Sequence, residues 1–225
     1  MTSSATINRV EPVHLMIADG HRLVADALAV ALDLPGFHVT IAADPTETAA
    51  AVVEYRPDVV ILDLELDDAV NTITDLTTSG ARVVALATGD DINSTGAAVE
   101  AGADVVLLKT GRIDDLHDAL DRLAAGDDVY GQTRRVQLLD AYQRARTERK
   151  ARLAPFEQLT RREHDVLAGL YDGLAADAIA ERDYVSLPTV RSQIRGILQK
   201  LGVNSQLAAV ASARNAGWSN TLVAA

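Results

Sequence analysis

The segment PDVVILDLEL, residues 57–66, contains four consecutive apolar residues followed by an acid. The apolar residues are Val59–Leu62, and the acid is Asp63. A short apolar run without polar alternation predicts a strand that is buried on both faces, as in a parallel sheet covered by helices. Asp63 would then lie at the carboxyl end of this strand, where open parallel sheets place their functional sites.

The same pattern recurs on both sides of this segment. Apolar runs alternate with stretches of helical periodicity, and Asp44 followed by Pro45 is typical of a helix N-cap. Five strands alternating with five helices predict an α/β, doubly wound, five-stranded parallel sheet. The expected strands are 13–18, 37–42, 59–62, 82–87 and 105–108, and the expected helices are 22–32, 45–55, 70–78, 92–101 and 113–125.

Charged residues directly follow the first, third and fifth strands: Asp19, Asp63 and Lys109. Acid, acid and lysine in this order, each after an apolar strand, resemble the receiver domain of two-component systems. The matching segments are IADGHRLVADAL at 17–28, PDVVILDLEL at 57–66 and GADVVLLKT at 102–110, within residues 13–125. The resemblance implies a flavodoxin-like fold.

The resemblance also implies a phosphoryl group carried on Asp63. Mg²⁺ would be held by Asp63 and the backbone carbonyl of Glu65, with Asp19 helping through water, because this ion prefers oxygen ligands. Lys109 would pair with the phosphoryl oxygens as a point charge. His21 follows Asp19 closely in sequence and is expected to line the pocket.

The sequence departs from the receiver pattern at several positions. The second acid of the usual pair is replaced by Gly20, which removes a direct metal ligand. The hydroxyl residue after the fourth strand is replaced by Ala87, and the neighbouring Thr88 is expected to point to the opposite face. The aromatic switch position of the fifth strand is Val106.

A further departure follows Asp63, where a Met-Pro pair and a glycine are usual and this chain reads LELDDAVN at 64–71. Asp67 and Asp68 add negative charge close to the expected acceptor. We therefore interpret the domain as an atypical receiver that works largely without phosphorylation, with weak Mg²⁺ binding at Asp19, Asp63 and Glu65. The alternative is an ordinary response regulator phosphorylated on Asp63 by a sensor histidine kinase. The predicted pocket comprises Asp19, Gly20, Asp63, Ala87, Thr88 and Lys109.

The charge is distributed unevenly along the 225 residues, whose net charge is −11. Residues 1–125 carry 7 Lys and Arg against 21 Asp and Glu, whereas residues 126–158 have net charge +2 and residues 159–225 net charge +1. Such asymmetry suggests two units with different tasks. The expected division is a disordered N-terminus at 1–12, a receiver-like domain at 13–125, a linker helix region at 126–158, a DNA-binding domain at 159–217 and a tail at 218–225. Within the linker region, Pro155 is expected to end the helical stretch.

The second unit shows strong helix signals. Thr160 and Glu163 form a capping box, and a later helix, 188–200, has an apolar stripe spaced i, i+4, i+7, i+8 and i+11. The segments LTRREHDVLAGLYDGL, IAERDYVSLPTVRSQIRGILQKLGV and NSQLAAV closely resemble the LuxR-type helix-turn-helix of NarL/FixJ response regulators. This resemblance implies an all-α four-helix domain whose third helix enters the major groove of DNA.

The third helix carries the expected DNA contacts. Arg191 and Arg195 lie one turn apart on the polar face, and arginine can bind guanine bidentately. Thr189, Ser192 and Lys200 suit phosphate contacts, which position the helix without reading sequence. The usual cap and phosphate-binding lysine of the short second helix are replaced by Ala175 and Asp177, which predicts modest affinity. The fourth helix is expected to form a dimer contact through Gln206, Ala209, Val210 and Ala213.

Several functional classes are excluded or disfavoured. Cysteine is absent, which excludes disulfides and thiolate chemistry, and no Gly-rich phosphate loop indicates a nucleotide-hydrolysing enzyme. No apolar run approaches the roughly 20 residues of a membrane-spanning helix. We expect a cytoplasmic, non-enzymatic transcription regulator that binds double-stranded DNA as a homodimer, with a kinase or other signalling protein as a further partner. The alternative of another class is a protein- or ligand-binding module with vestigial DNA binding.

Overall fold

The computed structural model describes residues 12–33 and 35–219, and the chain divides into two compact units after Arg144. The predicted disorder at 1–12 falls almost wholly outside the described residues, as does the tail beyond residue 219.

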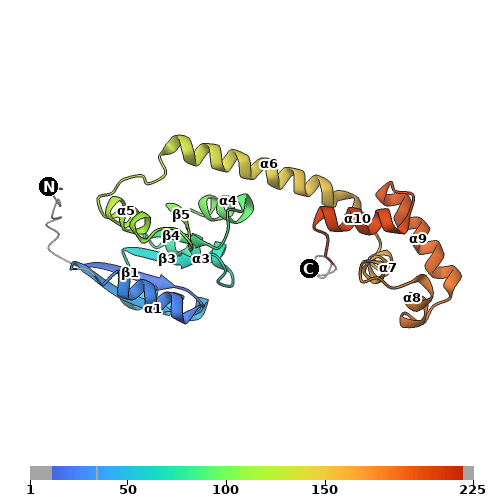
Figure 1. Ribbon diagram of the computed structural model, residues 1–225, viewed down its shortest axis with the longest axis horizontal. Coiled ribbons are helices and arrows are strands. Elements are labelled where there is room, and N and C mark those ends of the chain that lie inside the picture. Colours follow the sequence, from blue (N-terminus) through green and yellow to red (C-terminus); the bar gives the residue numbers. More distant parts are fainter. Residues whose placement is uncertain (1–11, 34, 220–225) are drawn as a thin grey trace. The chain divides into compact units, whose positions relative to one another are not determined.

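The first unit contains a five-stranded, all-parallel sheet with the strand order β2-β1-β3-β4-β5 (Figure 1), which confirms the predicted fold. The predicted strands match closely; β3 extends by one residue to include Asp63. The strands are β1 Val13–Ala18, β2 Phe37–Ala42, β3 Val59–Asp63, β4 Arg82–Ala87 and β5 Val105–Leu108, and the helices are α1 Arg22–Ala31, α2 Pro45–Tyr55, α3 Ala69–Thr78, α4 Ile92–Glu100 and α5 Ile113–Ala124.

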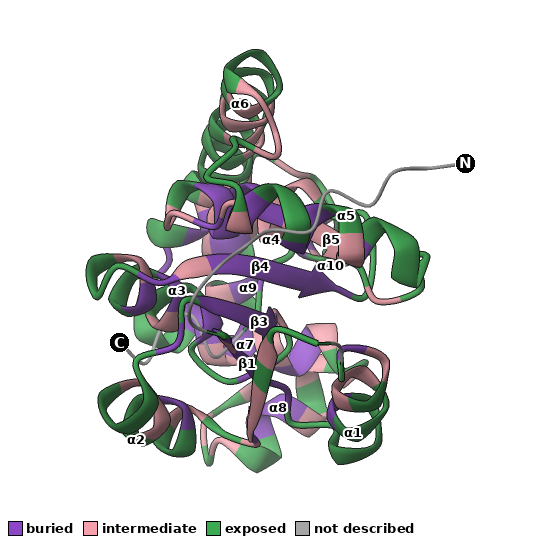
Figure 2. Cartoon of the chain, turned by 90° about the vertical axis from the view of Figure 1, so that its left-hand side faces the viewer, coloured by how far each residue is buried: buried purple, intermediate pink, exposed green. Residues whose placement is uncertain are grey.

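Helices cover both faces of the sheet, as near-continuous apolar strands require. Alternate residues of β1 divide between the two layers: Leu15 and Ile17 pack with α1 and α5, whereas Met16 packs on the other face with α2, α3 and α4. Figure 2 shows β3 and β4 buried between helices whose outer surfaces are exposed. The predicted N-cap of α2 is also confirmed, because the Asp44 carboxylate accepts a hydrogen bond from the Glu47 amide at 2.8 Å.

A linker helix lies within residues 126–158, as the sequence indicated, but its C-terminal end differs from the expectation. Helix α6 runs through Gln132–Glu157, so Pro155 lies inside its last turn instead of ending it, which corrects the expectation. The reason is tertiary: Phe156 is buried in the core of the second unit and Leu153 packs against that core. This packing offsets the backbone hydrogen bond that proline cannot donate.

The N-terminal part of α6 and the segment before it are fastened to the first unit. The Tyr130 hydroxyl accepts a hydrogen bond from the Val106 amide at 3.0 Å, and Arg135 donates to the Ala103 carbonyl at 3.0 Å. Tyr142 packs so closely on Gly96 of α4 that a methyl group at Gly96 would overlap its side chain. The predicted linker region therefore belongs in part to the first unit.

The second unit is a helical bundle around one core. At its C-terminal end, Trp218 is 4 % exposed and packs beside Phe156, His164 and Tyr171, with ring-centroid distances of 5.9–6.1 Å. The capping box at Thr160 is present as predicted. The helices are α7 Arg161–Tyr171, α8 Ala176–Arg182, α9 Leu187–Leu201 and α10 Gln206–Ala216.

We expect His164 to make the stability of the second unit sensitive to mild acid. Burial lowers the pKa of His164, although Asp165, Glu163 and a hydrogen bond to the Phe156 backbone act in the opposite direction. The unfolded chain then binds the proton more readily, so the stabilisation is present above about pH 6.5 and is lost as the pH falls through that value towards the folded-state pKa. Urea unfolding followed by Trp218 fluorescence should show a midpoint that decreases between about pH 7.5 and 5.

His164→Gln should remove this slope, whereas replacement of His38, which lies in the first unit, should leave it unchanged. The Glu163 carboxylate does not interfere in this range because its own pKa is lowered: burial alone would raise it, but hydrogen bonds from Lys200 and Thr160 outweigh burial. A slope that persists in His164→Gln would contradict the assignment.

Candidate functional site

Three charged side chains meet at the carboxyl edge of the sheet. Asp19 follows β1, Asp63 ends β3 and Lys109 follows β5, and the two carboxylate residues are each 1 % exposed. The Lys109 Nζ atom lies 2.7 Å from Asp63 Oδ2 and 3.1 Å from Asp19 Oδ2. The arrangement follows from topology, because adjacent parallel strands β1 and β3 end at the same edge and the chain reverses its strand order there.

The amine of Lys109 is firmly held as a cation. Burial alone would lower the pKa of Lys109, but hydrogen bonds and attraction to Asp63 and Asp19 outweigh burial, and the net shift is upward. Lys109 therefore stays protonated at neutral pH and neutralises part of the charge of the two carboxylates.

Backbone and imidazole groups complete the pocket. The Glu65 amide donates to Asp63 Oδ1 at 3.0 Å, and the His21 amide donates to Asp19 Oδ1 at 2.7 Å. The His21 Nδ1 atom lies 3.3 Å from Asp19 Oδ1 and 3.6 Å from Asp63 Oδ2. Sequence reasoning placed His21 in the pocket lining, but its approach to both carboxylates emerges only from the structure.

Two positions that depart from the receiver pattern, Gly20 and Ala87, lie next to the pocket. Ala87 is buried and Thr88 is exposed, so the neighbouring hydroxyl does not take the place of the missing one. A Cβ atom at Gly20 would meet Ala43 and Leu66 at ordinary contact distances of 3.7 and 3.9 Å, so the local packing does not require glycine at this position.

These residues fit a magnesium ion held by few protein ligands. Two buried carboxylates face one another across the pocket, and Mg²⁺ is commonly bound by one or two carboxylates with waters completing its shell. Asp19, Asp63 and the Glu65 carbonyl are the groups that would hold it. Gly20 supplies no carboxylate, so this ion would be held more weakly than by a complete acidic pair.

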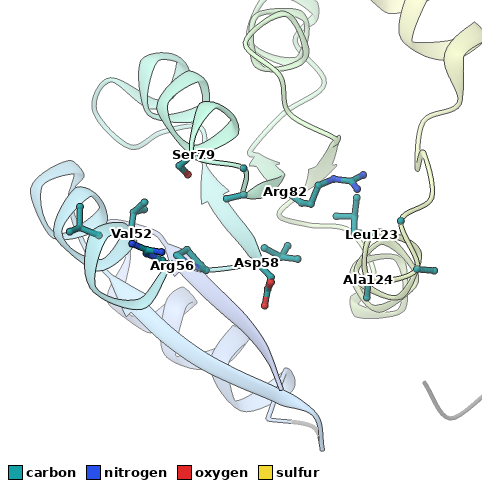
Figure 3. Close-up of a pocket in the computed structure, with 14 residues that line it drawn as sticks. Val52, Arg56, Asp58, Ser79, Arg82, Leu123 and Ala124 are labelled. Carbon is teal, nitrogen blue, oxygen red and sulfur yellow. The ribbon is translucent and has the colours of Figure 1, made fainter. Parts of the chain in front are cut away.

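A separate cavity of about 780 Å³ lies at the opposite end of the sheet (Figure 3). Its walls come from the C-terminal ends of α2, α3 and α5 and from residues at the starts of β3 and β4, among them Asp58 and Arg82. Arg82 is already ion-paired with Asp104 at 2.9 Å. None of the pocket residues predicted from the sequence lines this cavity.

Helix α9 presents the predicted polar face. Arg191, Ser192 and Arg195 are exposed, whereas Val190, Ile194 and Ile197 are buried in the core of the second unit. The first turn of α9 is fixed by Ser186, which accepts the Thr189 amide at 3.3 Å and lies 2.7 Å from the Thr189 hydroxyl. Thr189 is exposed as expected, but part of its hydrogen-bonding capacity is used within the cap.

Lys200 has an internal partner that the sequence did not reveal. Its Nζ atom donates to Glu163 Oε2 at 2.6 Å, and the same oxygen accepts the Thr160 amide at 2.7 Å. Lys200 therefore links the end of α9 to the capping box of α7. A phosphate contact from this amine stays a prediction and would have to compete with Glu163.

The expected dimer contact on α10 is corrected in part. Ala209 and Ala213 are 0 % exposed and belong to the core of their own unit, so neither reaches a partner surface. Val210 is half-buried, Gln206 is exposed, and the outward face carries Leu207, which is 80 % exposed. Because α10 contains alanines on several sides, its sequence did not reveal which face is buried.

Tyr184, in the turn between α8 and α9, is a surface feature that the sequence analysis missed. Its side chain is 96 % exposed and its backbone has φ 54°, in the left-handed region that non-glycine residues rarely adopt.

Comparison with known proteins supports both the receiver resemblance of the first unit and the helix-turn-helix resemblance of the second. The family model of the response regulator receiver domain matches residues 15–121, and that of bacterial regulatory proteins of the luxR family matches residues 157–213. The nitrate/nitrite response regulator NarP of Escherichia coli is 33 % identical over 204 residues, covering 88 % of this chain and 93 % of that protein. The chain is a response regulator of the NarL/FixJ type.

Other relatives support this membership. A nitrate/nitrite response regulator homologue from Haemophilus influenzae is 30 % identical over 205 residues, covering 88 % of this chain and 95 % of that protein. A solved structure of the Salmonella typhimurium response regulator RcsB has a TM-score of 0.51 at 21 % identity, covers 89 % of this chain and 97 % of RcsB, and shows a shared fold. This response regulator belongs to a class of DNA-binding transcription regulators and not of enzymes. Within its described part, no helix is both long and apolar enough to span a bilayer.

Proposed function

We propose that this response regulator binds DNA in the cytoplasm as a homodimer and that its receiver works largely without phosphorylation. The main support is the buried Ala87 at the end of β4, where a receiver needs a hydroxyl to bind the phosphoryl group. Gly20 weakens the metal site, and the exposed Asp67 and Asp68 add negative charge next to the acceptor. Lys109 is the one group of the predicted pocket whose charge attracts a phosphoryl anion.

The DNA-binding part of the proposal rests on the surface of α9. Arg191 and Arg195 are exposed one turn apart, with Ser192 between them. One groove can receive both guanidinium groups, since residues four apart share a helix face. The dimer would form through the outward face of α10, with Gln206 and Leu207 at the contact and Val210 at its edge. Two recognition helices would then read an inverted or direct repeat.

Two alternatives make different use of the same residues. An ordinary response regulator would be phosphorylated on Asp63 by a sensor histidine kinase, and the ion pairs of Lys109 with Asp63 and Asp19 are consistent with that use. A protein-interaction module with vestigial DNA binding would have no reason to retain an exposed arginine pair on α9, so the second alternative is less well supported.

The phosphorylation-independent reading predicts that Asp63→Asn has little effect on output. DNA affinity and dimerisation should stay within about 0.5 kcal/mol of wild type, the usual agreement for sites that are not coupled to one another. Incubation with a small phosphodonor and Mg²⁺ should give little phosphoprotein when measured by intact mass. The double variant Gly20→Asp, Ala87→Thr restores an acid and a hydroxyl, and it should gain more phosphoryl mass than the wild type does.

A stoichiometric mass gain on the wild-type protein, absent in Asp63→Asn and accompanied by a tenfold rise in DNA affinity, would restore the ordinary response-regulator reading. Mapping of bound DNA across the genome identifies the operator for these affinity measurements.

A further inference from the structure

Helix α8 ends differently from most helices of the chain. The Tyr184 amide donates to the Glu181 carbonyl at 3.3 Å and the Val185 amide to the Ala180 carbonyl at 3.0 Å, a pair of bonds that holds Tyr184 in the left-handed conformation at φ 54°. Glycine is the usual residue at this position because a side chain strains it. Helices α3, α4, α5, α7, α9 and α10 are each followed, within two residues, by a glycine of positive φ: Gly80, Gly102, Gly126, Gly173, Gly202 and Gly217.

The side chain of Tyr184 does not compensate for this strain by packing. It is 96 % exposed, and within residues 12–33 and 35–219 its ring and hydroxyl make no ring contact and no hydrogen bond. Residues held in strained conformations are concentrated at binding and catalytic sites, where the strain is retained for function. The fold of the second unit therefore does not explain why a tyrosine stands at this position.

Tyr184 lies close to the end of α9 that would enter DNA. It stands in the turn that joins α8 to α9 (Figure 1), two positions before Ser186, the N-cap of α9. The N-terminal residues of a recognition helix enter the major groove, which is about 12 Å wide, so phosphates of both strands flank that end of the helix. A side chain that protrudes beside the N-terminus is within reach of one of these phosphate walls.

The other polar groups around this turn already have partners. The hydroxyls of Ser186 and Thr189 lie 2.7 Å apart, and the Ser186 hydroxyl also accepts the Thr189 amide. The Asp183 carboxylate is paired with Arg182 at 2.7 Å, which offsets the negative charge next to Tyr184. The Tyr184 hydroxyl is thus an available donor, and tyrosine hydroxyls are among the groups that bind DNA phosphates.

We propose that the Tyr184 hydroxyl donates a hydrogen bond to a phosphate oxygen of the operator, beside the N-terminus of α9. This inference rests on the proposed DNA binding through α9 and adds a contact to it. A phosphate contact fixes the orientation of the helix without reading sequence, so Tyr184 is a positioning residue, whereas Arg191 and Arg195 read the bases.

The test measures binding of the full-length protein to the selected operator and to a shuffled duplex. Tyr184→Phe removes only the hydroxyl and should weaken binding to both duplexes by about fivefold or more, leaving their ratio unchanged. The dependence of affinity on salt should also be unchanged, because an uncharged phenol releases no counterions from DNA. Tyr55→Phe, which removes an exposed phenol of the first unit, is the matched control and should bind as wild type does.

Tyr184→Gly separates this role from a structural one. It relieves the backbone strain and removes the phenol, so the urea midpoint reported by Trp218 fluorescence should rise while affinity for both duplexes falls. A tyrosine retained for the fold would give a lower midpoint. Arg56→Gly is the control for strain relief alone: Arg56 ends α2 in the first unit with φ 45°, and its replacement should leave DNA affinity unchanged.

A Tyr184→Phe variant that binds both duplexes as tightly as wild type would overturn the proposal. A loss confined to the operator would also overturn it, because that pattern indicates base reading. Failure of the proposed function looks different, since the Arg191→Ala, Arg195→Ala variant would then keep its preference for the operator. If the arginine variant loses that preference and Tyr184→Phe has no effect, DNA binding through α9 stands and the tyrosine contact is wrong.

Discussion

Replacement of Arg191 and Arg195 by alanine together is expected to abolish sequence preference in DNA binding. Each arginine that reads a base contributes about 1–3 kcal/mol of discrimination, so losing both reduces specific affinity by roughly 30-fold to more than 10,000-fold. Both side chains are exposed on one face of α9, while the opposite face is buried in the domain core, so the substitutions should not unfold the protein.

The measurement compares the selected operator with a shuffled duplex at one fixed salt concentration, because phosphate contacts make affinity salt-dependent. Arg152→Ala is the matched control: it removes an exposed arginine of the second unit that lies on α6 instead of α9. The control should retain the ratio between the two duplexes. If the double variant selects the same site with unchanged affinity, the assignment of α9 as recognition helix is wrong.

Lys109→Met is expected to destabilise the first unit by about 3 kcal/mol, because removal of one partner from a buried ion pair leaves uncompensated charge. Asp19 and Asp63, each 1 % exposed, would then face each other without the lysine cation. The stabilisation is fully present at neutral pH: the pKa of Lys109 is raised in the folded state, so this contribution is lost only when the pH rises above about 10.4.

Two optical probes separate the units in this experiment. Trp218 is the only tryptophan and lies in the second unit, so its fluorescence reports unfolding of that unit, whereas far-UV circular dichroism reports both. Lys109→Met should shift the dichroism transition to lower urea and leave the fluorescence transition in place. Asp63→Asn in the same background should recover much of the loss, because it removes one of the two carboxylates. A Lys109→Met variant as stable as wild type would show that the carboxylates do not depend on this amine.

The sequence alone was sufficient for the architecture of the first unit. Apolar runs such as Val59–Leu62, when they alternate with amphipathic helices, predict a covered parallel sheet, and parallel strands bring their carboxyl ends to one edge. The meeting of Asp19, Asp63 and Lys109 therefore followed from their positions after strands. Caps at Asp44 and Thr160 were equally readable, because capping uses neighbours within three or four residues.

Contacts between residues that are far apart in the chain could not be predicted from sequence patterns. Lys200 and Glu163 are 37 positions apart, and their 2.6 Å contact exists because α7 and α9 pack together. The approach of the His21 ring to both carboxylates depends on the course of the loop after β1, which sequence spacing leaves open.

The remaining differences have the same physical origin. Local propensity ends a helix at Pro155, but burial of Phe156 in a core assembled from the rest of the unit keeps the last turn of α6 helical. Alanines occupy several sides of α10, so periodicity indicated neither that Ala209 and Ala213 face inward nor that Leu207 faces solvent. The sequence by itself determined the elements, their order and the edge where the charges meet, because these follow from local hydrogen bonding and strand burial. Only the tertiary structure determined which face of each helix is buried and which charges pair, because both depend on what the rest of the chain brings into contact.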